Sequence, residues 1–305
     1  MRTFSFKIEE ADSGERLDRF LALKFTDDLS RTFIRKMIDS GCVLIDGSVP
    51  KAHRKIKEGE TVDVREPEMP AVLIEPEDIP VDIVYEDDDI LVVNKRPGIV
   101  THPGPGNMSG TLVNALLHHC GSLSSGGDRL RPGIVHRLDK GTSGLMVVAK
   151  NDRSHRVLAR QFKKRTVKKT YVAIVKGIVQ LDFGTIDLPI ARSNMDRKKM
   201  SVKFVESKRA VTNYKVLKRY GAFTFIELDL ETGRTHQIRV HMSYLGHPIL
   251  GDDKYGGKCP ELKRPALHAK GLAFKHPATK KKVEFTTEIH DDLKKYLDEH
   301  EEEKD

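Results

Sequence analysis

Hydrophobic and polar residues alternate with helical spacing in the first part of the chain. Residues 16–25 place apolar side chains at helical intervals, and a second helix is expected after Ser30, which can cap it, with Gly41 at its end. The apolar run 42–45, an Asp-Gly turn signal and the run 60–64 then predict short strands. This pattern predicts two small helices packed on a small sheet.

Further along the chain, strand-like apolar runs alternate with helical patterns. The runs are residues 90–93, 145–149, 171–175, 223–230 and 271–274. Asn151 and Thr235 can each cap a helix between them, and the second of these helices is expected to end at Gly246. Strands and helices mixed in this way predict an α+β domain with a largely mixed sheet.

A proline-rich stretch separates these two parts. Residues 66–82 contain four prolines and six acidic residues and no basic residue, which predicts a linker because closely spaced prolines interrupt regular elements. The expected domains are residues 1–65, a small α/β domain, and residues 83–290, which carry the chemistry. Residues 291–305 contain eight acids and three lysines and are interpreted as an acidic C-terminal tail.

Composition excludes several classes of protein. The chain is 38% hydrophobic and 32% charged, and no window approaches the roughly 18 consecutive apolar residues that cross a bilayer. Its start lacks the pattern of a signal peptide, so a cytoplasmic protein without a membrane partner is expected. The three cysteines lie far apart without CxxC spacing, which predicts neither a disulfide framework nor a zinc site. Neither a P-loop nor GxGxxG occurs, so we expect no cofactor and no metal.

The net charge of +8 and the pI of 9.2 indicate a polyanionic partner. Because the C-terminal segment is acidic, the remainder of the chain is more basic than the total suggests. That excess is sufficient to contact a phosphate backbone, although many solvated protein surfaces are also basic.

The N-terminal stretches GERLDRFL, LSRTFIRKMIDSGCVLIDG and KEGETVDV resemble the RNA-binding domain named after small-subunit ribosomal protein S-four. The resemblance covers about residues 14–64. The alternative is a small helical domain whose charged face is only solvated. The residues that we expect to contact phosphates are Arg16, Arg19, Arg31, Arg35 and Lys36.

The segment GIVHRLDKGTSGLMVVAK, residues 133–150, is interpreted as a strand, a polar loop and a second strand. Asp139 lies in the loop. Taken alone, an Asp in such a loop is more often a turn or cap residue than a catalyst.

Five blocks extend this observation. HRLDKGTSGL is similar to the signature of the RluA family of pseudouridine synthases, and so are LVVNKRPGIVTHP, KKTYVAIVKG, GRTHQIRVHMSYLGHPILGD and ALHAKGLAFKHP, in the family's order over about residues 81–288. With the N-terminal domain, the chain resembles the RluD branch, which implies large-subunit ribosomal RNA as substrate, with transfer RNA as the other possibility, and not DNA. The resemblance implies that Asp139 is catalytic, that Arg137 fills the space left by a flipped base, that Tyr171 stacks on the uracil, that Arg239 pairs with Asp139, and that Leu267 forms an apolar wall.

Such a reaction needs one carboxylate, which acts either as a nucleophile or as a base, and the residues alone leave both routes open.

Two other classes of protein are alternatives. A non-catalytic RNA-binding or ribosome-assembly factor is expected to lose Asp139, Tyr171 or Arg239, and a hydrolytic nuclease or glycosidase is expected to show metal ligands or a carboxylate pair. His236 and His241 lack the spacing of a zinc protease and are interpreted as supporting residues. A monomer is expected.

Overall fold

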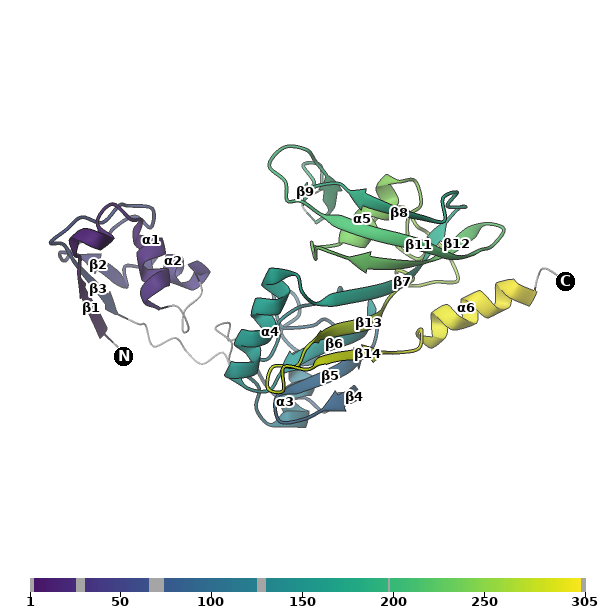
Figure 1. Cartoon of the computed structure of the whole chain (residues 1–305), viewed down its shortest axis with the longest axis horizontal. Helices are drawn as coiled ribbons and strands as arrows, with labels where there is room; N and C mark the ends of the chain where they lie inside the picture. The colour runs from purple at the N-terminus through teal and green to yellow at the C-terminus, as the bar shows by residue number, and fades with distance from the viewer. Residues whose placement is uncertain (1–2, 26–30, 66–73, 125–129, 197, 303–305) are drawn as a thin grey trace. The chain divides into compact units, whose positions relative to one another are not determined.

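The computed structural model describes residues 3–25, 31–65, 74–124, 130–196 and 198–302. These residues form two compact units (Figure 1). The first contains residues 3–65 with Leu130, and the second contains residues 74–124 and 131–302.

The first unit packs two helices on a three-stranded antiparallel sheet. Its elements are β1 (Thr3–Lys7), a short 3-10 helix (Glu10–Asp12), α1 (Leu17–Lys24), α2 (Arg31–Asp39), β2 (Val43–Ile45) and β3 (Thr61–Arg65), with sheet order β1-β3-β2. Phe20, Ile38 and Val62 lie in its apolar core. The two predicted helices and the two predicted strands are present, whereas β1 was not predicted although Phe4 and Phe6 alternate with polar residues.

The second unit is built on a mixed nine-stranded sheet, so the α+β prediction is confirmed. The strand order is β4-β5-β6-β13-β7-β12-β11-β8, with β14 paired to β13; among the described strands, only β6 and β13 pair in parallel. The strands are β4 (Asp82–Glu86), β5 (Ile90–Lys95), β6 (Ser143–Ala149), β7 (Lys168–Lys176), β8 (Phe183–Asp187), β11 (Val211–Arg219), β12 (Phe223–Leu230), β13 (Leu267–Lys275) and β14 (Lys282–Thr286). A separate hairpin joins β9 (Ile190–Arg192) to β10 (Met200–Val202).

Strand β6 is covered by apolar cores on both faces of the sheet. All seven of its residues are buried. Met146 and Val148 face one apolar core, while Leu145 and Val147 face another. Because side chains alternate along a strand, a run of consecutive apolar residues fits a strand that lies between two cores.

The described part of the second unit also contains four helices: α3 (Leu112–Cys120), α4 (Asp152–Lys164), α5 (Gln237–Tyr244) and α6 (Asp291–Glu302). Helix α4 contributes Leu158 to the second core of the sheet, and Asn151 caps this helix as predicted, by accepting a hydrogen bond from the Ser154 amide. None of the helices within the described ranges is long and apolar enough to cross a membrane.

Three local predictions were wrong. The strand expected before the Asp139 loop is only an isolated bridge between Ile134 and Val148. The residue that caps α5 is His236 rather than Thr235, and its side chain makes no capping hydrogen bond. The segment interpreted as an acidic C-terminal tail begins with α6, because apolar residues at helical spacing among the acids, including Leu293 and Leu297, are buried in the main core.

The predicted linker lies partly outside the described residues, which omit 66–73. Residues 74–81 form neither helix nor strand, and β4 begins at Asp82, the last residue of the predicted linker.

Candidate active site

The loop that carries Asp139 is held by the segment that follows β5. The Thr101 hydroxyl donates a hydrogen bond to the Leu138 carbonyl over 3.0 Å, and the Gly98 amide donates to the Lys140 carbonyl over 2.8 Å. The Leu138 side chain is buried in the main core. The residues on both sides of Asp139 are therefore anchored, which fixes the backbone position of Asp139.

A buried lysine lies beneath this loop. Lys95 Nζ donates hydrogen bonds to the carbonyls of Arg96 and Ile99, each over 3.0 Å, and reaches the Lys140 carbonyl at 3.4 Å. Burial, assisted by the positive charge of Arg264, lowers the pKa of Lys95 to about 7, although the negative charge of Asp139 acts in the opposite direction. The loop thus rests on an ammonium group whose charge changes near neutral pH.

Arg239 bridges two carboxylates. Its Nη1 donates to Oδ2 of Asp139 over 3.0 Å, while Nε and Nη2 donate to Oδ2 and Oδ1 of Asp252 over 2.6 Å and 2.9 Å. Asp252 is 1% exposed, whereas Asp139 is 24% exposed. Burial opposes the charge of Arg239, but the hydrogen bonds and charges of Asp252 and Asp139 outweigh it and raise the pKa of the arginine. The buried pair with Asp252 therefore orients Arg239 toward Asp139.

Asp252 was not singled out in the sequence, although it ends the block GHPILGD. Its position in a Gly-Asp turn after an apolar run is common in loops, so no local signal distinguished it.

Tyr171 and Leu267 lie on one face of the sheet. Tyr171 lies on β7 and is buried, and Leu267 begins β13, where it pairs with Ala173. Paired residues on neighbouring strands point to the same face, and so do residues two apart on one strand. The side chains of Leu267 and Tyr171 therefore share a face of the sheet, and they pack in the same core. Burial and the negative charge of nearby Asp139 raise the pKa of Tyr171, so its phenol stays protonated.

Arg137 is exposed, and His102 holds its guanidinium. Arg137 Nη1 lies 3.3 Å from Nε2 of His102, and Nδ1 of His102 lies 2.9 Å from the Pro103 carbonyl oxygen. Because a carbonyl can only accept, Nδ1 carries the proton and Nε2 accepts from Arg137. His102, in the block THP, was not predicted from the sequence.

The predicted phosphate contacts on the first unit differ in their availability. Arg16 forms an ion pair with Asp18 at 2.7 Å, and Arg19 forms one with Glu15 at 3.4 Å. Arg35 and Lys36 lie exposed on α2 and have no ion-pair partner among the described residues. The side chain of Arg31 lies outside the described residues.

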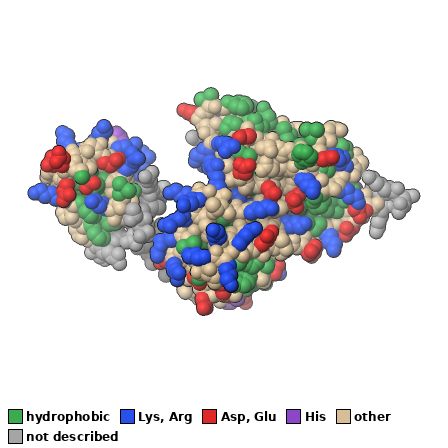
Figure 2. Space-filling view, viewed as in Figure 1, with side chains coloured by type: hydrophobic (Ala, Val, Ile, Leu, Met, Phe, Trp, Pro, Cys, Tyr) green, Lys and Arg blue, Asp and Glu red, His purple; other side chains and the backbone are tan. Residues whose placement is uncertain are grey.

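A basic surface covers α4 on the second unit. Figure 2 shows Lys and Arg side chains gathered over this helix. Their positions in the sequence repeat at helical spacing, opposite the buried Leu158. Within the described ranges none of them forms an ion pair. We call these five exposed residues the α4 basic surface: Arg153, Arg156, Arg160, Lys163 and Lys164.

Two other clusters of charged residues lie on the second unit. Glu86, His119 and Cys120 could together hold a metal ion, but Glu86 already pairs with His119 and with Lys150, each at 2.8 Å. The ammonium of Lys150 opposes a bound cation, so this group is better described as an ion-pair cluster.

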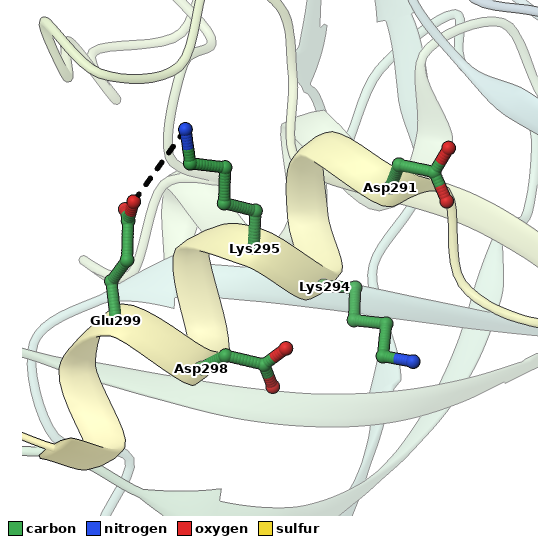
Figure 3. Close-up of a pocket in the computed structure, with 5 residues that line it drawn as sticks. All are labelled: Asp291, Lys294, Lys295, Asp298 and Glu299. Carbon is green, nitrogen blue, oxygen red and sulfur yellow. Dashed lines mark ion pairs between the residues drawn. The ribbon is translucent and has the colours of Figure 1, made fainter.

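A shallow depression of about 290 Å³ on α6 is lined by charged residues of that helix, as Figure 3 shows. Lys295 pairs there with Glu299 at 3.7 Å, and Lys294 lies beside Asp298. None of the predicted site residues lines this depression, so we do not assign it a function.

Comparison with known proteins identifies relatives of the chain. The family model for RNA pseudouridylate synthase matches residues 89–244. A Bacillus subtilis (strain 168) protein named uncharacterized RNA pseudouridine synthase YlyB is 48% identical over 98% of both chains. Ribosomal large subunit pseudouridine synthase D of Zymomonas mobilis is 46% identical over 96% of both. The structure of human RNA pseudouridylate synthase domain containing 1 superposes with a TM-score of 0.58 at 31% identity, covering 68% of this chain and 83% of the human one.

Proposed function

The chain belongs to the RNA pseudouridylate synthase family and is an isomerase of uridine in RNA, and we propose that its substrate is large-subunit ribosomal RNA and its catalytic carboxylate Asp139. The proposed substrate rests on relatives named for the large ribosomal subunit, such as the Zymomonas mobilis protein. The proposed carboxylate rests on the geometry around Asp139.

The observation that carries the proposal is the unequal environment of the two Asp139 oxygens. Oδ2 accepts a hydrogen bond from Arg239, whereas Oδ1 has no hydrogen-bond partner among the described residues. Oδ1 is therefore the oxygen free to face the substrate.

The reaction breaks the bond between ribose carbon 1′ and uracil nitrogen 1 and forms a bond between carbon 1′ and uracil carbon 5. Carbon 5 loses its proton, and nitrogen 1 gains one. A carboxylate can serve this exchange as nucleophile or as base.

The neighbouring side chains support a flipped-out nucleotide. Extrusion of a base from its stack costs a few kcal/mol, which contacts in the pocket must offset. We assign the stacking on uracil to Tyr171 and the apolar wall to Leu267, since both share one face of the sheet beside Asp139. Arg137, exposed and two residues before Asp139, fills the vacated space in the RNA.

The α4 basic surface supports binding of the RNA backbone. Along one face of a helix it presents cations that form no ion pair with any residue the structure describes, and β7, which carries Tyr171, follows soon after α4 in the chain. Cations of this kind bind phosphates irrespective of sequence. On the first unit, Arg35 and Lys36 are the predicted phosphate contacts that form no ion pair among the described residues.

The activity is tested with RNA tritiated at uracil carbon 5, which releases tritium when pseudouridine forms. We expect release by the wild type, none by Asp139→Asn, and wild-type release by Asp298→Asn, a matched exchange at an exposed position of α6. Turnover by Asp139→Asn would show that another carboxylate acts. Retention of the label on ribosomal RNA with release from transfer RNA would overturn the proposed substrate.

The expectations of a monomer and of a cytoplasmic location stay predictions. Sedimentation of the purified protein and fractionation of cells test them.

A further inference from the structure

A second polar side chain faces the carboxylate of Asp139. His236 Nε2 lies 3.7 Å from Oδ2, the oxygen that also accepts from Arg239. His236 has a φ of 55° and a ψ of 22°, a left-handed conformation that is uncommon for residues other than glycine. Such a conformation persists only where the surroundings hold it, and it often occurs at functional sites.

Tyr255 holds the ring of His236. The tyrosine hydroxyl lies 2.8 Å from His236 Nδ1, and it accepts a hydrogen bond from the Met200 amide over 2.9 Å. The hydroxyl has no third hydrogen-bond partner within the described ranges. Because the tyrosine oxygen already accepts from the Met200 amide, donation of its own hydrogen to Nδ1 of His236 is the favoured arrangement.

This arrangement favours one tautomer of His236. With Nδ1 accepting from Tyr255, the single proton of the neutral ring is on Nε2, which faces Asp139. Burial lowers the pKa of His236, which favours the neutral ring. The negative charges of Asp139 and Asp252 raise this pKa, whereas the positive charges of Arg239 and Lys254 lower it. Asp139 is thus faced by an N–H group rather than by a lone pair.

Tyr255 also contacts the other residue that binds Asp139. The guanidinium carbon of Arg239 lies 5.0 Å from the centroid of the Tyr255 ring, and the His236 ring meets that ring edge-on at 5.6 Å. One tyrosine therefore supports both of the side chains that face Oδ2 of Asp139.

We propose that His236 is a positioning residue for Asp139: its Nε2–H, held in place by Tyr255, engages Oδ2 and reserves Oδ1 for the uridine. This inference rests on the proposed role of Asp139. The distance of 3.7 Å exceeds a hydrogen bond in the RNA-free protein, and the contact shortens when RNA fills the site, as catalytic hydrogen bonds commonly do.

The test compares His236→Ala, His236→Gln and Tyr255→Phe in the tritium-release assay with saturating RNA. Loss of one hydrogen bond to a charged group corresponds to about a 10- to 100-fold effect on a rate. We expect His236→Ala to lower kcat by about that factor and to leave KM largely unchanged. His236→Gln should recover part of the loss, because its amide places an N–H near the position of Nε2. His118→Gln, on the exposed end of α3, is the matched control and should behave as the wild type.

Tyr255→Phe removes only the hydroxyl that sets the tautomer, so its effect should not add to that of His236→Ala in the double variant. Equal losses for His236→Ala and His236→Gln, unchanged kcat for His236→Ala, or additive losses in the double variant would each overturn the inference. An inactive wild type would instead overturn the proposed function, and thermal unfolding of each variant identifies any that fail to fold.

Discussion

Asp252 holds Arg239 through two hydrogen bonds, of 2.6 Å and 2.9 Å, while a third N–H of the same guanidinium reaches Asp139. The buried carboxylate therefore acts on the candidate catalytic one through a rigid, planar group. Lysine cannot replace this bridge, since a single ammonium cannot reproduce a planar fork of donors.

We expect Asp252→Asn to reduce both stability and activity. Loss of the partner of a buried charge typically costs about 3 to 5 kcal/mol, and the hydrogen bond that Arg239 keeps with Asp139 should hold the loss near the lower end of that range. Urea unfolding measures the stability, and kcat measures the activity. Arg239→Lys keeps the charge, so we expect a smaller loss of stability and a comparable loss of kcat. A variant Asp252→Asn with wild-type kcat would contradict the orienting role.

A second prediction concerns Arg137 and His102. If Arg137 fills the space of the flipped base, Arg137→Ala should lower kcat/KM and reduce the fluorescence rise of 2-aminopurine placed next to the target uridine. His102→Ala leaves the guanidinium without its acceptor, and loss of one such hydrogen bond, about 1 kcal/mol, corresponds to about a fivefold loss of kcat/KM. Wild-type fluorescence with Arg137→Ala would place the base-replacing role elsewhere.

A third prediction concerns the α4 basic surface. Reversal of charge in the double variant Arg156→Glu/Arg160→Glu should raise KM for RNA and leave kcat largely unchanged. For every phosphate that the variant no longer binds, the slope of log affinity against log salt should fall by about 0.7 to 0.9. The matched control reverses Lys294 and Lys295 on α6, and the salt slope should not change. An unchanged slope for the α4 variant would show that the RNA backbone binds elsewhere.

A fourth prediction concerns stability at acid pH. His136 stacks on Phe162 with ring centroids 4.5 Å apart, and its Nε2 accepts from the Val147 amide. Burial, and to a lesser degree the charge of Lys169, lowers the pKa of His136 to about 3 from 6.5. Because the unfolded chain then binds the proton more readily, stability is full above pH 6.5 and falls as the pH drops toward 3.

Between pH 7 and pH 5 this histidine should account for about 1 to 2 kcal/mol of lost stability, allowing for its partial exposure. His136→Asn does not titrate and keeps an acceptor for the Val147 amide. We expect the variant to be less stable at pH 7 but to lose less on acidification, as measured by urea unfolding at both pH values. Parallel pH dependences of wild type and variant would show that His136 is not the group responsible.

Local patterns in the sequence were sufficient for many elements. The helical spacing of apolar residues predicted α1 and α2, and consecutive apolar residues predicted β6. The polar loop with Asp139, and the blocks with Tyr171 and Arg239, indicated the family and its chemistry, because both depend on residue types at fixed spacing along the chain.

Tertiary structure alone decided how these residues are supported. Asp139 and Arg239 lie 100 positions apart, and His102 lies 35 from Arg137. No local pattern specifies that Asp252 is the buried partner of Arg239, or that the Tyr255 hydroxyl contacts Nδ1 of His236. Such contacts depend on strand register and on how α5 packs, and both are set by the whole core. The sequence by itself therefore determined the chemical groups, and only the packing determined which partner holds each of them.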